Sequence, residues 1–184
     1  MRRGHEHRGT GPEGVAALLL TGTVGAGKTS AAIAAGELLE QAGIAAVVLD
    51  LDWLGWSHLG PEAPTPHQLI AQNLAAIWPN LLQAGMRRAV LTRAVRAATE
   101  VQGLRSAVGG TPLTVIRLTA TPSTLAARLR VRDRGAELRD HLTQAAAFAA
   151  AMDRDLREVP VVATDGLTPE SVAAAVLTLS GWMN

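Results

Sequence analysis

A glycine-rich run near the amino end of the chain has residue types and a spacing that suit phosphate binding. It follows the pattern Gly-x-x-x-x-Gly-Lys-Thr and consists of Gly22, Thr23, Val24, Gly25, Ala26, Gly27, Lys28 and Thr29. Its glycines allow successive N–H groups to turn toward one anion, and a following helix would add its positive dipole end. The lysine would reach the β- and γ-phosphates, and the hydroxyl after it suits Mg²⁺. The run predicts a phosphate-binding loop for ATP or a closely related nucleoside triphosphate.

The predicted nucleotide contacts extend one residue past this pattern. They are Gly22, Val24, Gly25, Ala26, Gly27, Lys28, Thr29 and Ser30. Lys28 is also predicted to be catalytic, because its ammonium would stabilise negative charge on the group in transfer. It is the only lysine among the 17 lysine and arginine residues. The need for a compact ammonium group explains why this position is lysine. A codon preference for arginine can explain, at the same time, why the other basic positions are arginine.

Two carboxylates, Asp50 and Asp52, follow the second apolar run of the sequence. In a parallel sheet, ligands bind beyond the carboxyl ends of the strands, so these acids would lie beside the phosphates. One of them can hold Mg²⁺ through water, and the other can take a proton from an attacking hydroxyl. The alternative interpretation is that either acid only caps a turn.

Arginine recurs at positions 128, 130, 132 and 134. On a helix, Arg128 and Arg132 share one face, as do Arg130 and Arg134. After the fourth strand of a phosphate-loop protein, this segment would lie where a lid closes over the triphosphate. We therefore expect Arg128, Arg132 and Arg134 to contact phosphate, with Arg132 acting in catalysis, because arginine stabilises the spread charge of the transition state. A solvated charged face is the alternative, and Arg130 fits it best.

Two tryptophans, Trp53 and Trp56, follow Asp52 in a stretch rich in glycine and proline. Indoles so near the predicted chemistry could wall an apolar pocket and stack on a ring or sugar face of the acceptor. The alternative is that each covers the edge of the sheet as part of the core. Arg93, just beyond the third apolar run, would hold an anionic or polar part of the acceptor. The predicted acceptor residues are thus Asp52, Trp53, Trp56 and Arg93.

The elements that must position these residues are strands that alternate with helices. Five continuous apolar runs predict buried strands at 15–21, 44–49, 88–92, 113–119 and 159–163. Helical spacing between caps and stops predicts helices at 29–42, 67–84, 93–108, 121–132, 137–157 and 169–179. Pro79 lies inside the second helix, where we expect a kink or a break. Runs that are apolar throughout indicate a parallel sheet covered on both faces.

Composition restricts the class of protein further. With 184 residues, the chain suits one domain at 14–184 behind a disordered tail at 1–13. The net charge of +1 gives no sign of nucleic-acid binding, and no apolar run is long enough to span a membrane. The sequence has no cysteine, which fits a cytoplasmic protein. Whether the protein is a monomer or a homodimer stays open.

Together these motifs resemble the small P-loop kinases grouped with adenylylsulfate kinase, chloramphenicol phosphotransferase and shikimate kinase. The resemblance covers roughly residues 15–180. It depends on the phosphate-binding loop, Asp50 and Asp52, Arg93 and the arginine-rich segment, in that order along the chain. The third strand lacks the acid of an ordinary Walker B motif, which argues against motor-type and AAA-type ATPases. The resemblance implies an α/β, three-layer fold with a parallel sheet ordered 2-3-1-4-5 and a short lid.

The resemblance also implies individual roles. The second acid of the pair faces the acceptor in these kinases, so Asp52 becomes the base or orienting carboxylate and Asp50 the Mg²⁺ partner of Thr29, with the reverse order as the alternative. Thr164 and Asp165 match the segment that borders the adenine. We therefore expect an ATP- and Mg²⁺-dependent transfer of the γ-phosphoryl group to a hydroxyl of a small molecule. The alternatives are a nucleoside or nucleotide kinase, and a nucleotide-binding regulatory or resistance module with little turnover.

Overall fold

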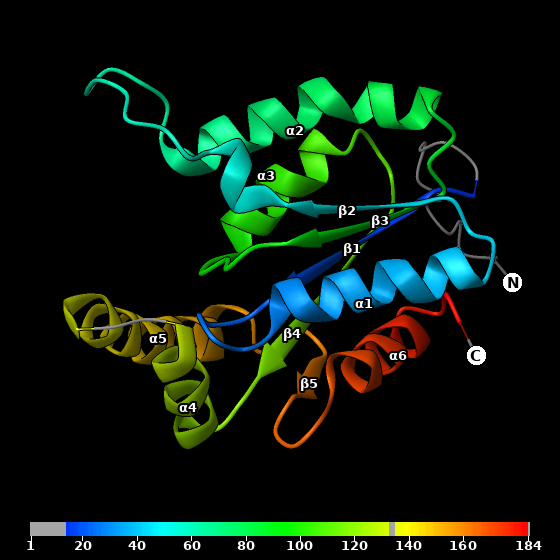
Figure 1. Cartoon of the computed structure of the whole chain (residues 1–184). Coiled ribbons are helices and arrows are strands. Elements are labelled where there is room, and N and C mark those ends of the chain that lie inside the picture. The colour runs from blue at the N-terminus through cyan, green and yellow to red at the C-terminus, as the bar shows by residue number, and fades with distance from the viewer. Residues whose placement is uncertain (1–13, 133–134, 184) are drawn as a thin grey trace, which may run out of the picture.

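Five parallel strands form the centre of the molecule, in the order β2-β3-β1-β4-β5 (Figure 1). The computed structural model describes residues 14–132 and 135–183. The strands are β1 (Ala16–Thr21), β2 (Ala46–Asp50), β3 (Arg88–Thr92), β4 (Leu113–Thr119) and β5 (Val161–Ala163). Both the parallel sheet and its strand order are confirmed. The predicted tail at 1–13 lies outside the described residues.

Helices cover both faces of this sheet, which gives three layers. They are α1 (Lys28–Gln41), α2 (Pro66–Gln83), α3 (Ala98–Ala107), α4 (Pro122–Arg132), α5 (Gly135–Asp155) and α6 (Pro169–Leu179). In Figure 1, α2 and α3 lie on one side of the sheet, and α1 and α6 lie on the other. No helix in the described ranges is long and apolar enough to cross a membrane.

The central strand β1 shows why the apolar runs form this sheet. Its residues alternate between the two faces: Leu19 packs with α2 and α3, whereas Leu18 and Leu20 pack with α1 and α6. All three side chains are fully buried. Because both faces of a central parallel strand are covered, apolar residues are required at consecutive positions and not only at alternate ones.

The register brings the ends of three strands together. Leu20 of β1 pairs with Thr92 of β3, and Thr92 pairs in turn with Asp50 of β2. The segments that follow β1, β2 and β3 therefore leave the sheet side by side. They carry the phosphate-binding loop, the acid pair and Arg93, so the sheet places these three motifs at one edge.

Two helix predictions differ from the structure. Helix α2 is continuous through Pro79, so of the expected kink or break, the break does not occur. The buried face formed by Ile70, Leu74 and Trp78 offsets the hydrogen bond that proline removes. The helix expected to begin at Arg93 begins at Ala98, because Val95 N donates to Thr21 Oγ1 and holds the intervening segment across the end of the sheet.

Candidate active site

The phosphate-binding loop joins β1 to α1 and leaves the first N–H groups of that helix without side-chain caps. Gly27 precedes the helix with a φ of 91° and no side-chain cap hydrogen bond. The opening N–H groups of an α-helix have no partner within the helix. They are therefore available to an anion, and the helix dipole favours one at this point.

Glycine at position 22 is required by a close backbone contact. Gly22 has a φ of 147°, and a Cβ atom there would lie 2.3 Å from the carbonyl oxygen of Leu118 in β4. Any side chain would therefore push the loop away from the end of β4. The motif glycine thus serves the packing of the loop against the sheet.

The Lys28 ammonium is held over its own loop. Lys28 Nζ donates to the carbonyl oxygens of Gly22 and Thr23, each at 3.0 Å. These contacts place the positive charge where the loop surrounds an anion.

A hydroxyl and a carboxylate meet beside this loop. Thr29 Oγ1 donates to Asp50 Oδ2 at 3.2 Å. Hydroxyl and carboxylate oxygens are ligands that Mg²⁺ accepts, and this ion usually takes one or two protein carboxylates together with phosphates and water. Among the residues that the structure describes, no group of three or more His, Asp or Glu side chains forms a separate metal site. The pair fits an ion that is bound jointly with a nucleotide.

The two acids point to different partners. Asp50 Oδ1 accepts from the Asp52 backbone N–H at 3.2 Å and so caps the short 3₁₀ turn Leu51–Leu54. Asp52 Oδ1 accepts from Arg93 Nη1 at 3.0 Å. Asp50 therefore both caps a turn and faces Thr29, whereas Asp52 faces Arg93.

Helix α2 supports the turn that carries Asp52. The side chain of Asn73 donates to the carbonyl oxygen of Leu54 at 2.6 Å. Gly55 lies so close to α2 that an added Cβ would be 2.6 Å from the Ile70 side chain. The start of the helix is itself fixed by a capping box between Thr65 and Gln68. A rigid helix thus determines where this carboxylate stands.

Arg93 lies behind Asp52 and not in the wall of the cavity. Its side chain is only 8% exposed, while that of Asp52 is 62% exposed. Burial lowers the pKa of Arg93 from its ordinary value, and the neighbouring Asp52 carboxylate opposes this. The predicted direct contact between Arg93 and the acceptor has no support in this geometry, because the guanidinium is committed to protein partners.

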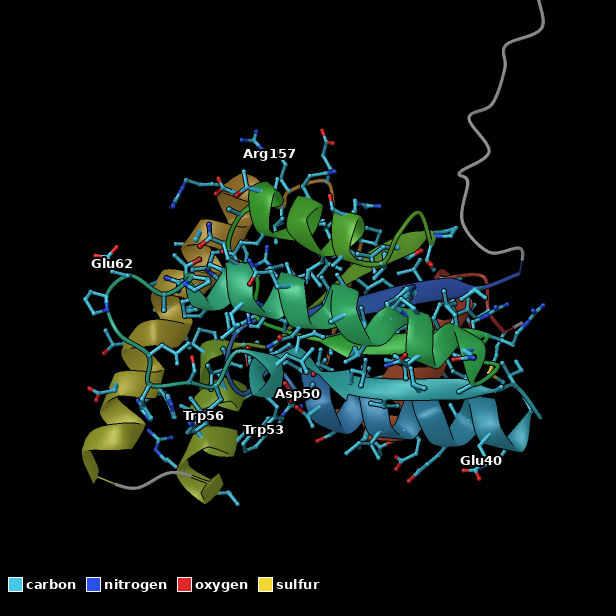
Figure 2. The ribbon with its side chains drawn as sticks, turned by 90° about the horizontal axis from the view of Figure 1, so that it is seen from above. Glu40, Asp50, Trp53, Trp56, Glu62 and Arg157 are labelled. Carbon is cyan, nitrogen blue, oxygen red and sulfur yellow. The ribbon has the colours of Figure 1, made fainter. Side chains whose placement is uncertain are left out.

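The two tryptophans near the acids form a stacked pair. The ring centroids of Trp53 and Trp56 are 5.3 Å apart with an interplanar angle of 14°. Both side chains are highly exposed, at 72% and 70%, so neither is a core residue. Trp56 lines the cavity, whereas Trp53 is not among its lining residues. Figure 2 shows both indoles at the Asp50 end of the sheet, with Glu40 at the far end of α1.

Arg128 joins the phosphate-binding loop to the segment after β5. Its guanidinium donates to Gly25 O at 3.2 Å, to Thr164 Oγ1 at 2.9 Å and to Thr164 O at 2.8 Å. The buried Thr164 hydroxyl donates in turn toward Ala26 O and Thr119 O. Arg128 and Thr164 both line the cavity.

The other predicted lid and adenine residues have different positions. Asp165 accepts from the backbone and hydroxyl of Thr121 at the start of α4 and does not line the cavity. Hydrogen bonds from Thr124 and Thr121 lower the pKa of Asp165 to about 2. Arg132 is the last residue of α4, and its side chain lies outside the described part of the chain. The prediction for Arg134 also falls outside the described residues.

One cavity of about 750 Å³ connects these groups. The phosphate-binding loop forms its floor, from Val24 to Ser30, and both Asp50 and Asp52 open into it. Sequence reasoning missed several lining residues, which are Ala94, Leu129, His141, Leu167, Pro169 and Val172. Apart from His141 these residues are apolar, and apolar residues carry no chemical signal in a sequence, although the cap formed by Thr168 and Pro169 did mark the start of α6.

Sequence reasoning also missed two titratable neighbours of Arg93, which are His67 and Glu100. His67 Nδ1 lies 2.5 Å from Arg93 Nη2 and 3.2 Å from Glu100 Oε2. Burial lowers the pKa of His67 from its ordinary value, with the nearby Arg93 adding to the effect and Glu100 opposing it. The residues come from three separate segments, so no local pattern could have connected them.

No protein-family model matches the chain, and no curated protein matches it by sequence. Solved structures do match. A sugar kinase from Janibacter sp. is 17% identical with a TM-score of 0.61, and the alignment covers 91% of this chain and 95% of that chain.

Two further structures are similar. The tunicamycin resistance protein of Deinococcus radiodurans is 19% identical, with a TM-score of 0.64 and coverage of 92% of this chain and 97% of that chain. Shikimate kinase from Bacteroides thetaiotaomicron is 16% identical, with a TM-score of 0.63 and coverage of 90% and 98%. The chain therefore has the fold of the P-loop small-molecule kinases, as its sequence motifs predicted.

Proposed function

We propose that this protein is an ATP- and Mg²⁺-dependent phosphotransferase that moves the γ-phosphoryl group to a hydroxyl of a small molecule. One observation carries the proposal: a single cavity holds the phosphate-binding loop, Asp50 bonded to Thr29 across 3.2 Å, and the more exposed Asp52 beyond them. Two of the similar structures, a sugar kinase and a shikimate kinase, support it by the activity in their names.

The nucleotide half of the site would bind the triphosphate by charge and shape. The loop N–H groups and Lys28 would hold the phosphates, and Thr29 with Asp50 would hold Mg²⁺. The bound ion would neutralise charge on the phosphate oxygens. Arg128 lies across the loop at Gly25, where a small shift of its guanidinium would bring it to the phosphates.

Asp52 would act on the acceptor. The acceptor hydroxyl gives its proton to Asp52 while its oxygen bonds to the γ-phosphorus. The bond from that phosphorus to the bridging oxygen breaks, and ADP leaves with the electron pair. Arg93 donates to Oδ1 of Asp52, which leaves Oδ2 to take the proton.

The described wall of the cavity favours an uncharged acceptor with a flat or apolar face. Lys28 and Arg128 are the Lys and Arg side chains among its lining residues, and both belong to the nucleotide half. The lining also includes Trp56 and Ala94, which closely follow Asp52 and Arg93 in the chain, and His141 of α5. A polyanionic nucleotide acceptor would need more cations there, so a sugar-like or ring-containing hydroxyl compound suits this wall better.

A second candidate is a binding module that confers resistance with little turnover. The observations that favour it are the structural similarity to a tunicamycin resistance protein and the exposed Trp53–Trp56 pair beside the cavity. An indole pair of this kind can hold a ring-bearing compound whether or not a phosphoryl group is transferred.

A coupled assay of ADP release separates the two candidates. Purified protein with Mg²⁺ and ATP is tested against a panel of uncharged sugars, polyols and hydroxylated antibiotics, with anionic analogues as matched partners. A kinase gives turnover that depends on the acceptor and is lost in Lys28→Ala. Tight ATP binding without turnover for any acceptor would support the binding module.

A further inference from the structure

The His67 ring lies between a cation and an anion, and a single nitrogen faces both. Nδ1 lies 2.5 Å from Arg93 Nη2 and 3.2 Å from Glu100 Oε2. A ring nitrogen without a proton accepts from the guanidinium, and the same nitrogen with a proton donates to the carboxylate. The two contacts therefore exclude each other as hydrogen bonds.

The surroundings of His67 favour the neutral ring. The ring is partly buried, and the positive charges of Arg93 and Arg96 both lower its pKa. His67 is the second residue of α2, and the positive end of the helix dipole at this position also opposes a positive charge on the ring. Glu100 and Asp52 act in the opposite direction, but burial has the largest effect and the net pKa lies below its ordinary 6.5.

With a neutral ring, Arg93 is held from two sides. Nη1 donates to Asp52 Oδ1 at 3.0 Å, and Nη2 donates to His67 Nδ1. A planar guanidinium with two partners in different directions has its orientation fixed. Because Arg93 is 8% exposed, solvent does not compete strongly for these donors.

Glu100 provides the alternative partner for the ring. Its Oε1 accepts from the Arg96 backbone N–H at 3.4 Å, while its Oε2 is buried with no hydrogen-bond partner among the described residues. A buried carboxylate oxygen without a donor is unfavourable. Protonation of His67 would give Glu100 Oε2 a hydrogen-bond donor, and the positive ring would at the same time repel Arg93.

We propose that His67 is a positioning residue whose neutral ring holds Arg93 against Asp52, and that Glu100 takes the ring from Arg93 when His67 is protonated. The proposal deepens the proposed function, because Asp52 is its acceptor base. It also explains why a buried arginine stands behind this acid: the guanidinium orients the carboxylate and does not bind the acceptor.

Nuclear magnetic resonance of the full-length protein, without nucleotide or acceptor, tests the proposal. With ¹⁵N-labelled histidine, the His67 signals are assigned by their loss in His67→Asn. At pH 8 we expect Nδ1 without a proton and Nε2 with one. The titration midpoint is expected below 6.5. The midpoint of His67 should rise in Arg93→Ala, because that change removes a positive charge near the ring. It should fall in Glu100→Gln, because that change removes a negative charge.

Rotation of the Arg93 guanidinium about its Nε–Cζ bond gives the second measurement. We expect slow rotation in the wild type and in His67→Asn, whose side-chain oxygen can accept near the position of Nδ1. Rotation should become fast in His67→Leu, which has no acceptor. His58→Asn is the matched control, because His58 is exposed and stands outside these contacts.

A protonated Nδ1 at pH 8, or slow rotation that persists in His67→Leu, would overturn the proposal. Neither measurement needs a substrate. If no acceptor supports turnover, that result counts against the proposed kinase activity and leaves the role of His67 unaffected. A protonated Nδ1 at pH 8, or slow rotation in His67→Leu, would instead exclude the positioning role of His67 and leave the proposed kinase activity unaffected.

Discussion

The hydroxyl of Thr29 lies 3.2 Å from Oδ2 of Asp50, although the two residues are 21 positions apart. Thr29 is the second residue of α1, and Asp50 ends the edge strand β2. Their contact links the phosphate-binding loop to the acid pair across the carboxyl edge of the sheet. It is the point in the structure where a nucleotide-bound Mg²⁺ would meet the protein.

Removal of this hydroxyl should weaken Mg²⁺ binding in the presence of ATP. For Thr29→Ala we expect the Mg²⁺ concentration for half-maximal activity to rise by about tenfold, as suits the loss of one contact to a charged group. Thr29→Ser, which keeps the oxygen, is the control. A Mg²⁺ titration of activity at fixed ATP checks this, and equal values for Ala and Ser would speak against a role for the hydroxyl.

Asp52 and Asp50 can be separated by single-turnover kinetics. Asp52→Asn should slow phosphoryl transfer at saturating acceptor by roughly 10²–10⁴-fold, the range for loss of a general base. Its affinity for ATP should stay nearly unchanged, because the nucleotide contacts are elsewhere. An unchanged rate would remove Asp52 from the chemistry and transfer the role to Asp50.

Trp56 and Trp53 should differ in their effect on acceptor binding. Trp56 lines the cavity and Trp53 stacks on its ring from outside the lining. Trp56→Ala should raise the KM for the acceptor by about tenfold, in line with an aromatic contact of ~1 kcal/mol or more, with little change for ATP. Trp53→Ala should have a smaller effect. If Trp56→Ala raised the KM for ATP as much as the KM for the acceptor, the substitution would have disrupted the whole turn.

Arg128 should matter for the nucleotide half of the site. It bonds Gly25 of the loop and Thr164 beyond β5. Arg128→Ala should weaken ATP binding measured by calorimetry and lower kcat more strongly, because an arginine at the transferring group gives ~10³-fold or more. Arg130→Ala, on the exposed side of the same helix, is the comparison. If both variants behave alike, the arginines are only a charged helix face.

Asp165 should contribute to stability in a defined pH range. Its pKa is lowered from 3.8 to about 2 by hydrogen bonds from Thr124 and Thr121. A lowered pKa means that this stabilisation is complete above the unfolded value and is lost as pH falls toward 2. Asp165→Ala should therefore lower the melting temperature at pH 7, and the difference from the wild type should shrink below pH 4. If the difference in melting temperature between the wild type and Asp165→Ala were the same at every pH, the ionised carboxylate would not be the source of the stabilisation.

Much of the fold could be predicted because its signals are local. The loop from Gly22 to Thr29 is a fixed pattern between a strand and a helix, and continuous apolar runs indicate strands covered on both faces. The position of the acid pair also follows, because the ends of parallel strands meet at one edge. Strand order itself came only from the resemblance to P-loop kinases, and the structure confirms it.

The contacts of Arg93 show where local reasoning failed. The helical pattern after β3 suggested a helix from this residue, and its charge suggested a ligand contact. In the structure, the bond from Val95 N to Thr21 Oγ1 holds this segment across the sheet and the helix starts only at Ala98. The guanidinium is thereby turned toward Asp52 and away from solvent.

Local stretches of sequence were enough to predict the phosphate-binding loop, the parallel sheet and the acids at its edge, because each depends on residues close together in the chain. Only the folded structure shows which carboxylate faces Thr29 and which faces Arg93, and that His67 of α2 and Glu100 of α3 meet behind Asp52. Those contacts depend on how helices from separate segments pack over the sheet. Packing is set by the whole core, so no single stretch of sequence records it.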